Sequence, residues 1–102
     1  MLSSIISNNI NQITALCKQH HVKELYVFGS AARNEMNDES DVDFLYTMQE
    51  IPLEEYADNS FEMEESLEKL LDRKVDLVAE KYLRNRFFIK ELNETKQLIY
   101  KV

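Results

Sequence analysis

The chain has 102 residues and a formal net charge of −7, with nineteen acidic side chains against twelve basic ones. This length suits one ordinary domain, so we predict a single domain over residues 1–102. The acidic balance argues against a protein that holds nucleic acid directly through its phosphates, because such proteins need a basic surface. One glycine and one proline exclude a collagen-like chain, and 44% hydrophobic residues exclude a disordered tail.

Cysteine usage and the N-terminus indicate the compartment. Cys17 is the only cysteine, so the chain forms no internal disulfide. The first basic side chain is Lys18, which is too late for the basic region of a secretory signal. No apolar run approaches the roughly 18 residues that a membrane span needs. We therefore expect a cytoplasmic protein with no membrane partner.

The first half of the chain predicts one helix and two strands. Apolar residues recur at helical intervals at Ile6, Ile10, Ile13 and Cys17, which predicts a single helix with Ser3 or Ser4 as its N-cap. Residues 25–28 are typical of a short strand that ends at Gly29. After the polar residues 34–40, a second strand is expected over residues 41–46.

The second half predicts two helices and two strands. Pro52 begins a long helix whose inward stripe is Tyr56, Met63, Leu67, Leu70 and Leu71. Its remaining faces carry the acidic residues Glu54, Glu55, Glu62, Glu64, Glu65 and Glu68, which we expect to be solvated, with docking to a basic protein surface as the alternative. A third strand is expected over residues 75–78, a helix over residues 84–92 that buries Phe88 and Leu92, and a last strand over residues 97–100. This order predicts an α/β (α+β) protein in which helices cover a small mixed sheet of undetermined strand order.

Gly29 and Ser30 form a candidate phosphate-binding turn. They directly follow a predicted strand, and a glycine there lets backbone N–H groups approach an anion without an intervening side chain. A helix starting after the turn would add its partial positive charge, and Arg33 is either a further phosphate contact or half of a surface salt bridge. No second glycine and no Gly-Lys-Ser/Thr sequence follow, so the turn is not a Walker A loop.

Three aspartates are candidate metal ligands. Asp41 and Asp43 flank Val42, and alternate residues of a strand share a face about 6.6 Å apart. At that distance the two charges repel by about 2 kcal/mol at an effective dielectric constant of 20, so we expect either a bound cation such as Mg²⁺ or a solvated strand end. Asp76 lies in an apolar strand and needs a partner. If its strand adjoins that of Asp41, the three acids could hold two Mg²⁺ ions about 3.5–4 Å apart for phosphoryl or nucleotidyl transfer.

The combination resembles the DNA polymerase β-like nucleotidyltransferase superfamily. Gly29-Ser30, ten further residues, Asp41-Val42-Asp43 and the later Asp76 carry the likeness. The fuller strings Gly29-Ser30-Ala31-Ala32-Arg33 and Ser40-Asp41-Val42-Asp43-Phe44-Leu45 are similar to its smallest branch, the minimal nucleotidyltransferases. One departure is Asn34, where the family often has glycine. Because asparagine tolerates left-handed backbone angles, we expect the turn to be kept.

The resemblance implies roles for these residues. Gly29 and Ser30 would bind the triphosphate of ATP, Asp41 and Asp43 would ligate both magnesium ions, and Asp76 would ligate one ion and help to remove the proton of the attacking hydroxyl. The resemblance also implies an antitoxin that transfers AMP to a tyrosine of a HEPN-domain ribonuclease toxin, which would be its protein partner in a larger assembly. Two alternatives stay open: neutralisation by stoichiometric binding without catalysis, and nucleotidyl transfer to a small molecule such as an aminoglycoside.

Overall fold

The computed structural model describes residues 2–37 and 40–102. Its elements in chain order are α1 (Ser4–Ser7), α2 (Ile10–Gln19), β1 (Val22–Phe28), η1 (Gly29–Ala31), β2 (Val42–Met48), α3 (Leu53–Leu71), β3 (Val75–Ala79), η2 (Glu80–Tyr82), α4 (Arg86–Thr95) and β4 (Gln97–Lys101). The two η elements are single 3₁₀ turns. No helix of this described part is long and apolar enough to cross a membrane.

The strands form one mixed sheet in the order β3-β2-β1-β4. β1 is antiparallel to both β2 and β4, whereas β2 and β3 are parallel. The parallel pair is joined by α3, because parallel neighbours need a crossover connection rather than a hairpin. The predicted α/β class with a small mixed sheet is therefore confirmed.

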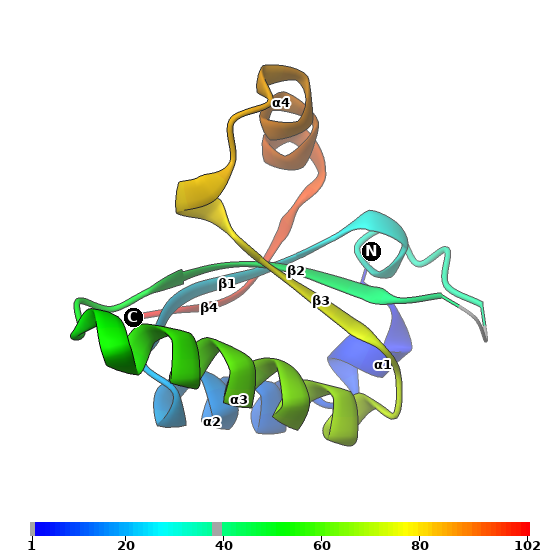
Figure 1. The fold of residues 1–102 in the computed structure, drawn as a ribbon. Coiled ribbons are helices and arrows are strands. Elements are labelled where there is room, and N and C mark those ends of the chain that lie inside the picture. The colour runs from blue at the N-terminus through cyan, green and yellow to red at the C-terminus, as the bar shows by residue number, and fades with distance from the viewer. Residues whose placement is uncertain (1, 38–39) are drawn as a thin grey trace.

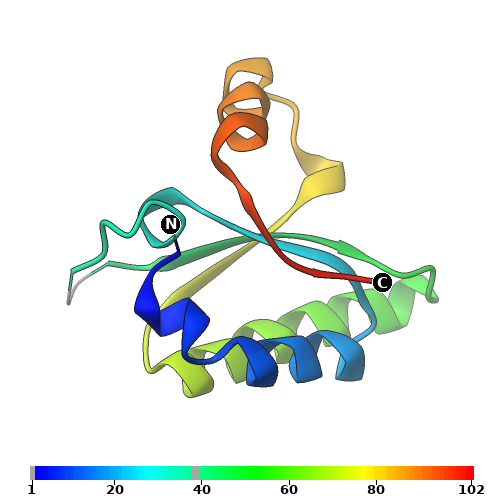
Figure 2. The same cartoon turned by 180° about the vertical axis from the view of Figure 1, so that it is seen from behind.

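The two faces of the sheet are covered differently. Figures 1 and 2 show α2 and α3 together beneath one face, with α4 standing apart on the other. The main core lies between the sheet and α2 and α3, and it includes the fully buried Ile13, Leu25, Phe44 and Leu67. On the α4 side, Phe28, Leu45 and Leu92 form a second, smaller buried cluster.

The N-terminal helix is divided, so the prediction of one continuous helix was wrong. α1 ends at Ser7 and α2 begins at Ile10. Between them, the Asn9 side-chain amide donates to the Ile5 carbonyl oxygen at 2.8 Å. Asparagine side chains compete in this way with the backbone for helix hydrogen bonds. Ser3 is the N-cap residue of α1 by position, although its side chain makes no capping hydrogen bond.

α4 departs most from the sequence-based expectation. It spans Arg86–Thr95 rather than residues 84–92, and the Asn85 side chain caps it by accepting from the Phe88 N–H at 3.0 Å. Leu92 is buried as predicted. Phe88 remains 36% exposed, so its predicted burial was wrong. Only part of the apolar face of α4 reaches the sheet, because the helix stands away from it (Figure 1).

Cys17 is fully buried between α2 and the sheet, which predicts an unreactive thiol. Burial raises the pKa of this thiol to about 12, and the thiolate is the form that reacts. We expect iodoacetamide at pH 8 to leave Cys17 unmodified in the folded protein and to alkylate it rapidly in denaturant, as followed by mass spectrometry. Equal rates in the two states would contradict the packing of α2.

Candidate active site

The sheet brings two of the predicted acidic residues, and the predicted glycine turn, to one place. Phe28, at the end of β1, pairs with Asp43 of β2, and Asp43 pairs with Asp76 of β3. Residues paired in register across a sheet project from the same face. The structure thus places Asp43 beside Asp76, and the Gly29 turn directly after the strand position opposite Asp43.

The aspartates lie on the more open face of the sheet. Val42 and Phe44 are fully buried in the core beneath α2 and α3, so Asp43 between them projects to the opposite face, where α4 lies. Asp41 directly precedes β2 and is exposed. These acids therefore stand where solvent and a ligand can reach them.

Gly29 approaches Asp43 too closely to be replaced without rearrangement. Its φ is +71°, in the left-handed region that disfavours side chains. A Cβ at this position would lie 2.7 Å from the Asp43 carboxylate oxygen Oδ2. The Asp43 carboxylate therefore packs directly against Gly29, and a side chain at position 29 would displace either that carboxylate or the turn.

The turn after Gly29 is held by distant parts of the chain. The backbone N–H of Ser3 donates to the Ala31 carbonyl oxygen at 2.9 Å, and the Gln97 side-chain amide donates to that of Ala32. Residues 29–31 form only a 3₁₀ turn, so the predicted contribution of a helix dipole was wrong: there is no stack of aligned peptide units behind Ser30. Backbone N–H groups are what the turn can offer an anion.

Asn34 and Arg33 follow the turn, and the sequence predicted a left-handed backbone for the first and either a phosphate contact or a salt bridge for the second. Asn34 adopts φ +57°, so asparagine does supply the left-handed conformation expected there. The Arg33 guanidinium pairs with Glu35 at 3.1 Å, with both side chains largely exposed. The surface salt bridge is therefore its arrangement in this structure, and a phosphate contact would require that pair to separate.

The aspartates repel one another, and their charges favour a cation. Burial, followed by the charges of Asp76 and Asp41, raises the pKa of Asp43 above its usual value. Among residues 2–37 and 40–102, no three His, Cys, Asp or Glu side chains form a complete group that could hold a metal ion. The carboxylate oxygens of Asp43 and Asp76 nevertheless suit Mg²⁺, because this ion takes one or two carboxylates together with phosphate oxygens and water.

Arg73 is a supporting residue that sequence reasoning missed. Its guanidinium donates to the carbonyl oxygens of Asn37 and Ser40, the latter at 3.2 Å. It thereby ties the start of β3 to the segment that leads into Asp41. The sequence gives no signal for this role, because the partners of Arg73 are backbone groups more than thirty residues away in sequence.

A family model described as "Polymerase beta, Nucleotidyltransferase" matches residues 11–102. The chain belongs to this nucleotidyltransferase family. It is 40% identical over 85 residues to MJ0128 of Methanocaldococcus jannaschii, which is named as a candidate protein adenylyltransferase; the match covers 83% of this chain and 82% of that protein. It is also 45% identical over 64 residues to the protein adenylyltransferase MntA of Thermococcus cleftensis, which covers 63% and 62% of the two chains.

Solved structures agree with this assignment. A structure described as a candidate minimal nucleotidyltransferase superposes with a TM-score of 0.72 at 30% identity, over 98% of this chain and 96% of that one. A toxin–antitoxin complex with AMP-PNP gives the same TM-score at 20% identity, over 92% and 74% of the chains. A complex of the tri-AMPylated Shewanella oneidensis HEPN toxin with its MNT antitoxin gives 0.65 at 18% identity, over 94% and 72%. The last two show a shared fold.

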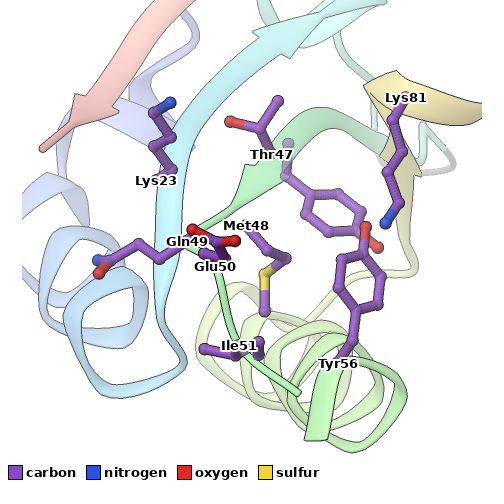
Figure 3. Close-up of a pocket in the computed structure, with 9 residues that line it drawn as sticks. Lys23, Thr47, Met48, Gln49, Glu50, Ile51, Tyr56 and Lys81 are labelled. Carbon is purple, nitrogen blue, oxygen red and sulfur yellow. The ribbon is translucent and has the colours of Figure 1, made fainter. Parts of the chain in front are cut away.

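Two pockets of this nucleotidyltransferase lie outside the aspartate site. The larger, of about 390 Å³, is at the far end of β2, where the Lys81 ammonium lies 4.2 Å from the centre of the Tyr56 ring (Figure 3). It begins at Tyr46, three strand residues or about 10 Å beyond Asp43. A smaller apolar pocket of about 150 Å³, lined by Leu45 and Leu92, lies on the same face as Asp43.

Proposed function

We propose that this nucleotidyltransferase is an antitoxin that transfers AMP from ATP to a tyrosine hydroxyl of a HEPN-domain toxin. The observation that carries the proposal is that Asp43 pairs with Asp76 on the neighbouring strand, while the Gly29 turn directly follows Phe28, the residue of β1 that pairs with Asp43. It combines a glycine turn, which packs against the Asp43 carboxylate, with two adjacent carboxylates that form no ion pair within the described residues 2–37 and 40–102. This is the set of groups that a triphosphate with bound magnesium would satisfy.

The site residues have distinct proposed roles. Backbone groups of Gly29 and Ser30, with Arg33 released from Glu35, bind the phosphates. Asp41, Asp43 and Asp76 would hold two Mg²⁺ ions, which fits the raised pKa of Asp43 because bound cations would remove the repulsion that causes part of it. When bound, the two ions would neutralise phosphate charge and stabilise the attacking and leaving oxygens.

The reaction needs no covalent intermediate on the protein. The acceptor hydroxyl oxygen forms a bond to the α-phosphorus of ATP, and the bond from that phosphorus to the bridging oxygen breaks, so that pyrophosphate leaves. Asp76 accepts the hydroxyl proton. The chain's contribution is to place both reactants in line and to hold their charges, which are the main sources of catalysis in such transfers.

Relatives support the choice of acceptor. MntA of Thermococcus cleftensis is named a protein adenylyltransferase, and the Shewanella oneidensis complex contains an AMPylated HEPN toxin beside an MNT antitoxin. We therefore assign this chain a protein acceptor of that class, with which it forms a complex.

The proposal is tested with radiolabelled ATP. The chain is incubated with α-labelled ATP, Mg²⁺, a HEPN-domain protein from the same organism and an aminoglycoside, and we expect label on a tyrosine of the HEPN protein, located by mass spectrometry. A parallel reaction with γ-labelled ATP should transfer no label, because the γ-phosphate leaves in pyrophosphate. Label on an aminoglycoside instead of protein would assign the small-molecule activity and overturn the proposal.

Ligand binding should also stabilise the protein before any transfer occurs. We expect Mg²⁺ with AMP-PNP to raise the Tm, because a ligand at 100 times its Kd adds about 2.7 kcal/mol to the free energy of unfolding. Mg²⁺ or the nucleotide alone should act more weakly, since the aspartates and the phosphates each supply only part of the metal coordination. An unchanged Tm with both present would count against the site itself.

A further inference from the structure

Two glutamates of α3 hold the outer edge of β3, the strand that carries Asp76. The backbone N–H of Val75 donates to Oε2 of Glu68 at 3.1 Å, and that of Leu77 donates to Oε1 of Glu64 at 3.3 Å. β3 is an edge strand, so its outer N–H groups face no neighbouring strand. The two carboxylates take the place of that missing strand, and we name this pair of contacts the glutamate clamp.

The spacing of the clamp matches the two elements. Glu64 and Glu68 are four residues apart on a helix, a rise of about 6 Å. Val75 and Leu77 are two residues apart on a strand, about 6.6 Å. Because α3 turns back into β3, the elements run in opposite directions, and the later glutamate meets the earlier N–H group.

The clamp distinguishes two glutamates from the rest of an acidic helix. All six glutamates of α3 were expected to be solvated, and for Glu64 and Glu68 this was wrong: both are partly buried. The nearby Glu62 and Glu65 are exposed; Glu62 lies 3.8 Å from His20 of α2, and Glu65 pairs with Lys69 on the same helix at 3.7 Å. General surface charge therefore does not explain the two contacts with β3.

We infer that the glutamate clamp positions Asp76 for metal binding. Alternate residues of a strand direct their backbone groups to opposite edges, so Val75 and Leu77 face the clamp while Asp76 between them faces β2. The backbone of Asp76 is thus held by β2 on one side, and its neighbours Val75 and Leu77 are held by α3 on the other. A ligating carboxylate must be kept within about 0.5 Å of its productive position, which an unsupported edge strand does not ensure. This inference rests on the proposed role of Asp76.

The first test examines the clamp in the protein without ligand. Amide hydrogen exchange of Val75 and Leu77 is measured by NMR in the parent chain, in Glu64→Ala/Glu68→Ala and in Glu64→Gln/Glu68→Gln. We expect exchange about tenfold faster or more in the alanine variant, since a hydrogen bond to a charged acceptor is lost. The glutamine variant keeps a side-chain oxygen acceptor and should stay near the parent. Glu62→Ala/Glu65→Ala removes the same charge from the same helix and serves as the control.

The second test examines the consequence for the site. The Mg²⁺ concentration that gives half-maximal AMP transfer should rise several-fold in the alanine variant, with kcat at saturating Mg²⁺ little changed, and the glutamine variant should restore the parent value. The affinity for AMP-PNP with Mg²⁺, measured by calorimetry, should follow the same order among the four proteins.

The two tests distinguish failure of the clamp's positioning role from failure of the proposed AMP transfer. Faster exchange with unchanged Mg²⁺ dependence and affinity would show that the clamp only protects the strand edge, and would overturn the inference. If the alanine and glutamine variants changed the Mg²⁺ dependence equally, the cause would be the lost charge and not the lost hydrogen bonds. This result would also overturn the inference. If the parent chain transfers no AMP, the proposed function fails, but exchange and AMP-PNP affinity still decide whether the clamp positions Asp76.

Discussion

Replacing Asp41 and Asp43 together by asparagine is expected to abolish AMP transfer while leaving the protein folded. Both positions would lose a charged magnesium ligand, and we expect the rate to fall by at least about 100-fold, the scale on which one preorganised charge-stabilising group acts. The measurement is transfer of label from α-labelled ATP to the HEPN protein at saturating Mg²⁺.

The same variant should be more stable than the parent when Mg²⁺ is absent. Because burial and the neighbouring acids raise the folded-state pKa of Asp43, its ionised form opposes folding. The resulting loss of stability is absent below the ordinary carboxyl pKa of 3.8. It grows as the pH rises and reaches its full size above the folded-state pKa of Asp43. At pH 7 the asparagine variant should therefore have the higher Tm, and at pH 3 the difference should vanish.

A matched control separates the site from general charge. Asp58 and Glu91 are exposed on α3 and α4, so Asp58→Asn with Glu91→Gln removes two negative charges elsewhere. We expect this control to retain transfer. In cells that also express the toxin, the Asp41/Asp43 variant should fail to neutralise it. Neutralisation at the parent level would instead assign the protein a stoichiometric binding mode.

The positions of the candidate site residues in the sheet were predictable because their signals are local. The alternation of Asp41, Val42 and Asp43 predicts that both carboxylates point away from the core, and Val42 is buried as this requires. Asp76 required one assumption, that its strand adjoins β2, which the parallel pairing of Asp43 with Asp76 confirms. Both predictions depended only on strand periodicity and on pairing in one register.

Features that depend on distant contacts were not predictable. The strand order and the distance of α4 from the sheet follow from packing between elements, so the exposure of Phe88 could not be deduced from its apolar spacing. Arg73 binds carbonyl groups of a remote loop, and Glu64 binds the next strand's backbone, although each has the sequence context of an ordinary surface charge. Side chains that satisfy backbone groups leave no periodic pattern.

Replacing Gly29 by alanine tests the phosphate turn with the smallest change that the chain allows. The left-handed φ of +71° costs a side-chain-bearing residue about 1–2 kcal/mol, and the new Cβ would lie 2.7 Å from Asp43 Oδ2. Because this contact is too short, either the Asp43 side chain or the turn must move. A misplacement of about 1 Å costs on the order of 100-fold in rate, so we expect a loss of transfer of that size together with a lower Tm.

Asn34→Gly provides the matched control for Gly29→Ala, because it changes a second left-handed position of the same turn in the opposite direction. At φ +57°, glycine relieves backbone strain without adding an atom, so transfer should be retained. Calorimetry with AMP-PNP and Mg²⁺, at a temperature where circular dichroism shows both variants folded, separates lost binding from lost stability. Parent-like affinity and transfer in Gly29→Ala would mean that the phosphates do not bind at this turn. The assignment of the turn would then have to be withdrawn, although Asp43 and Asp76 would remain paired.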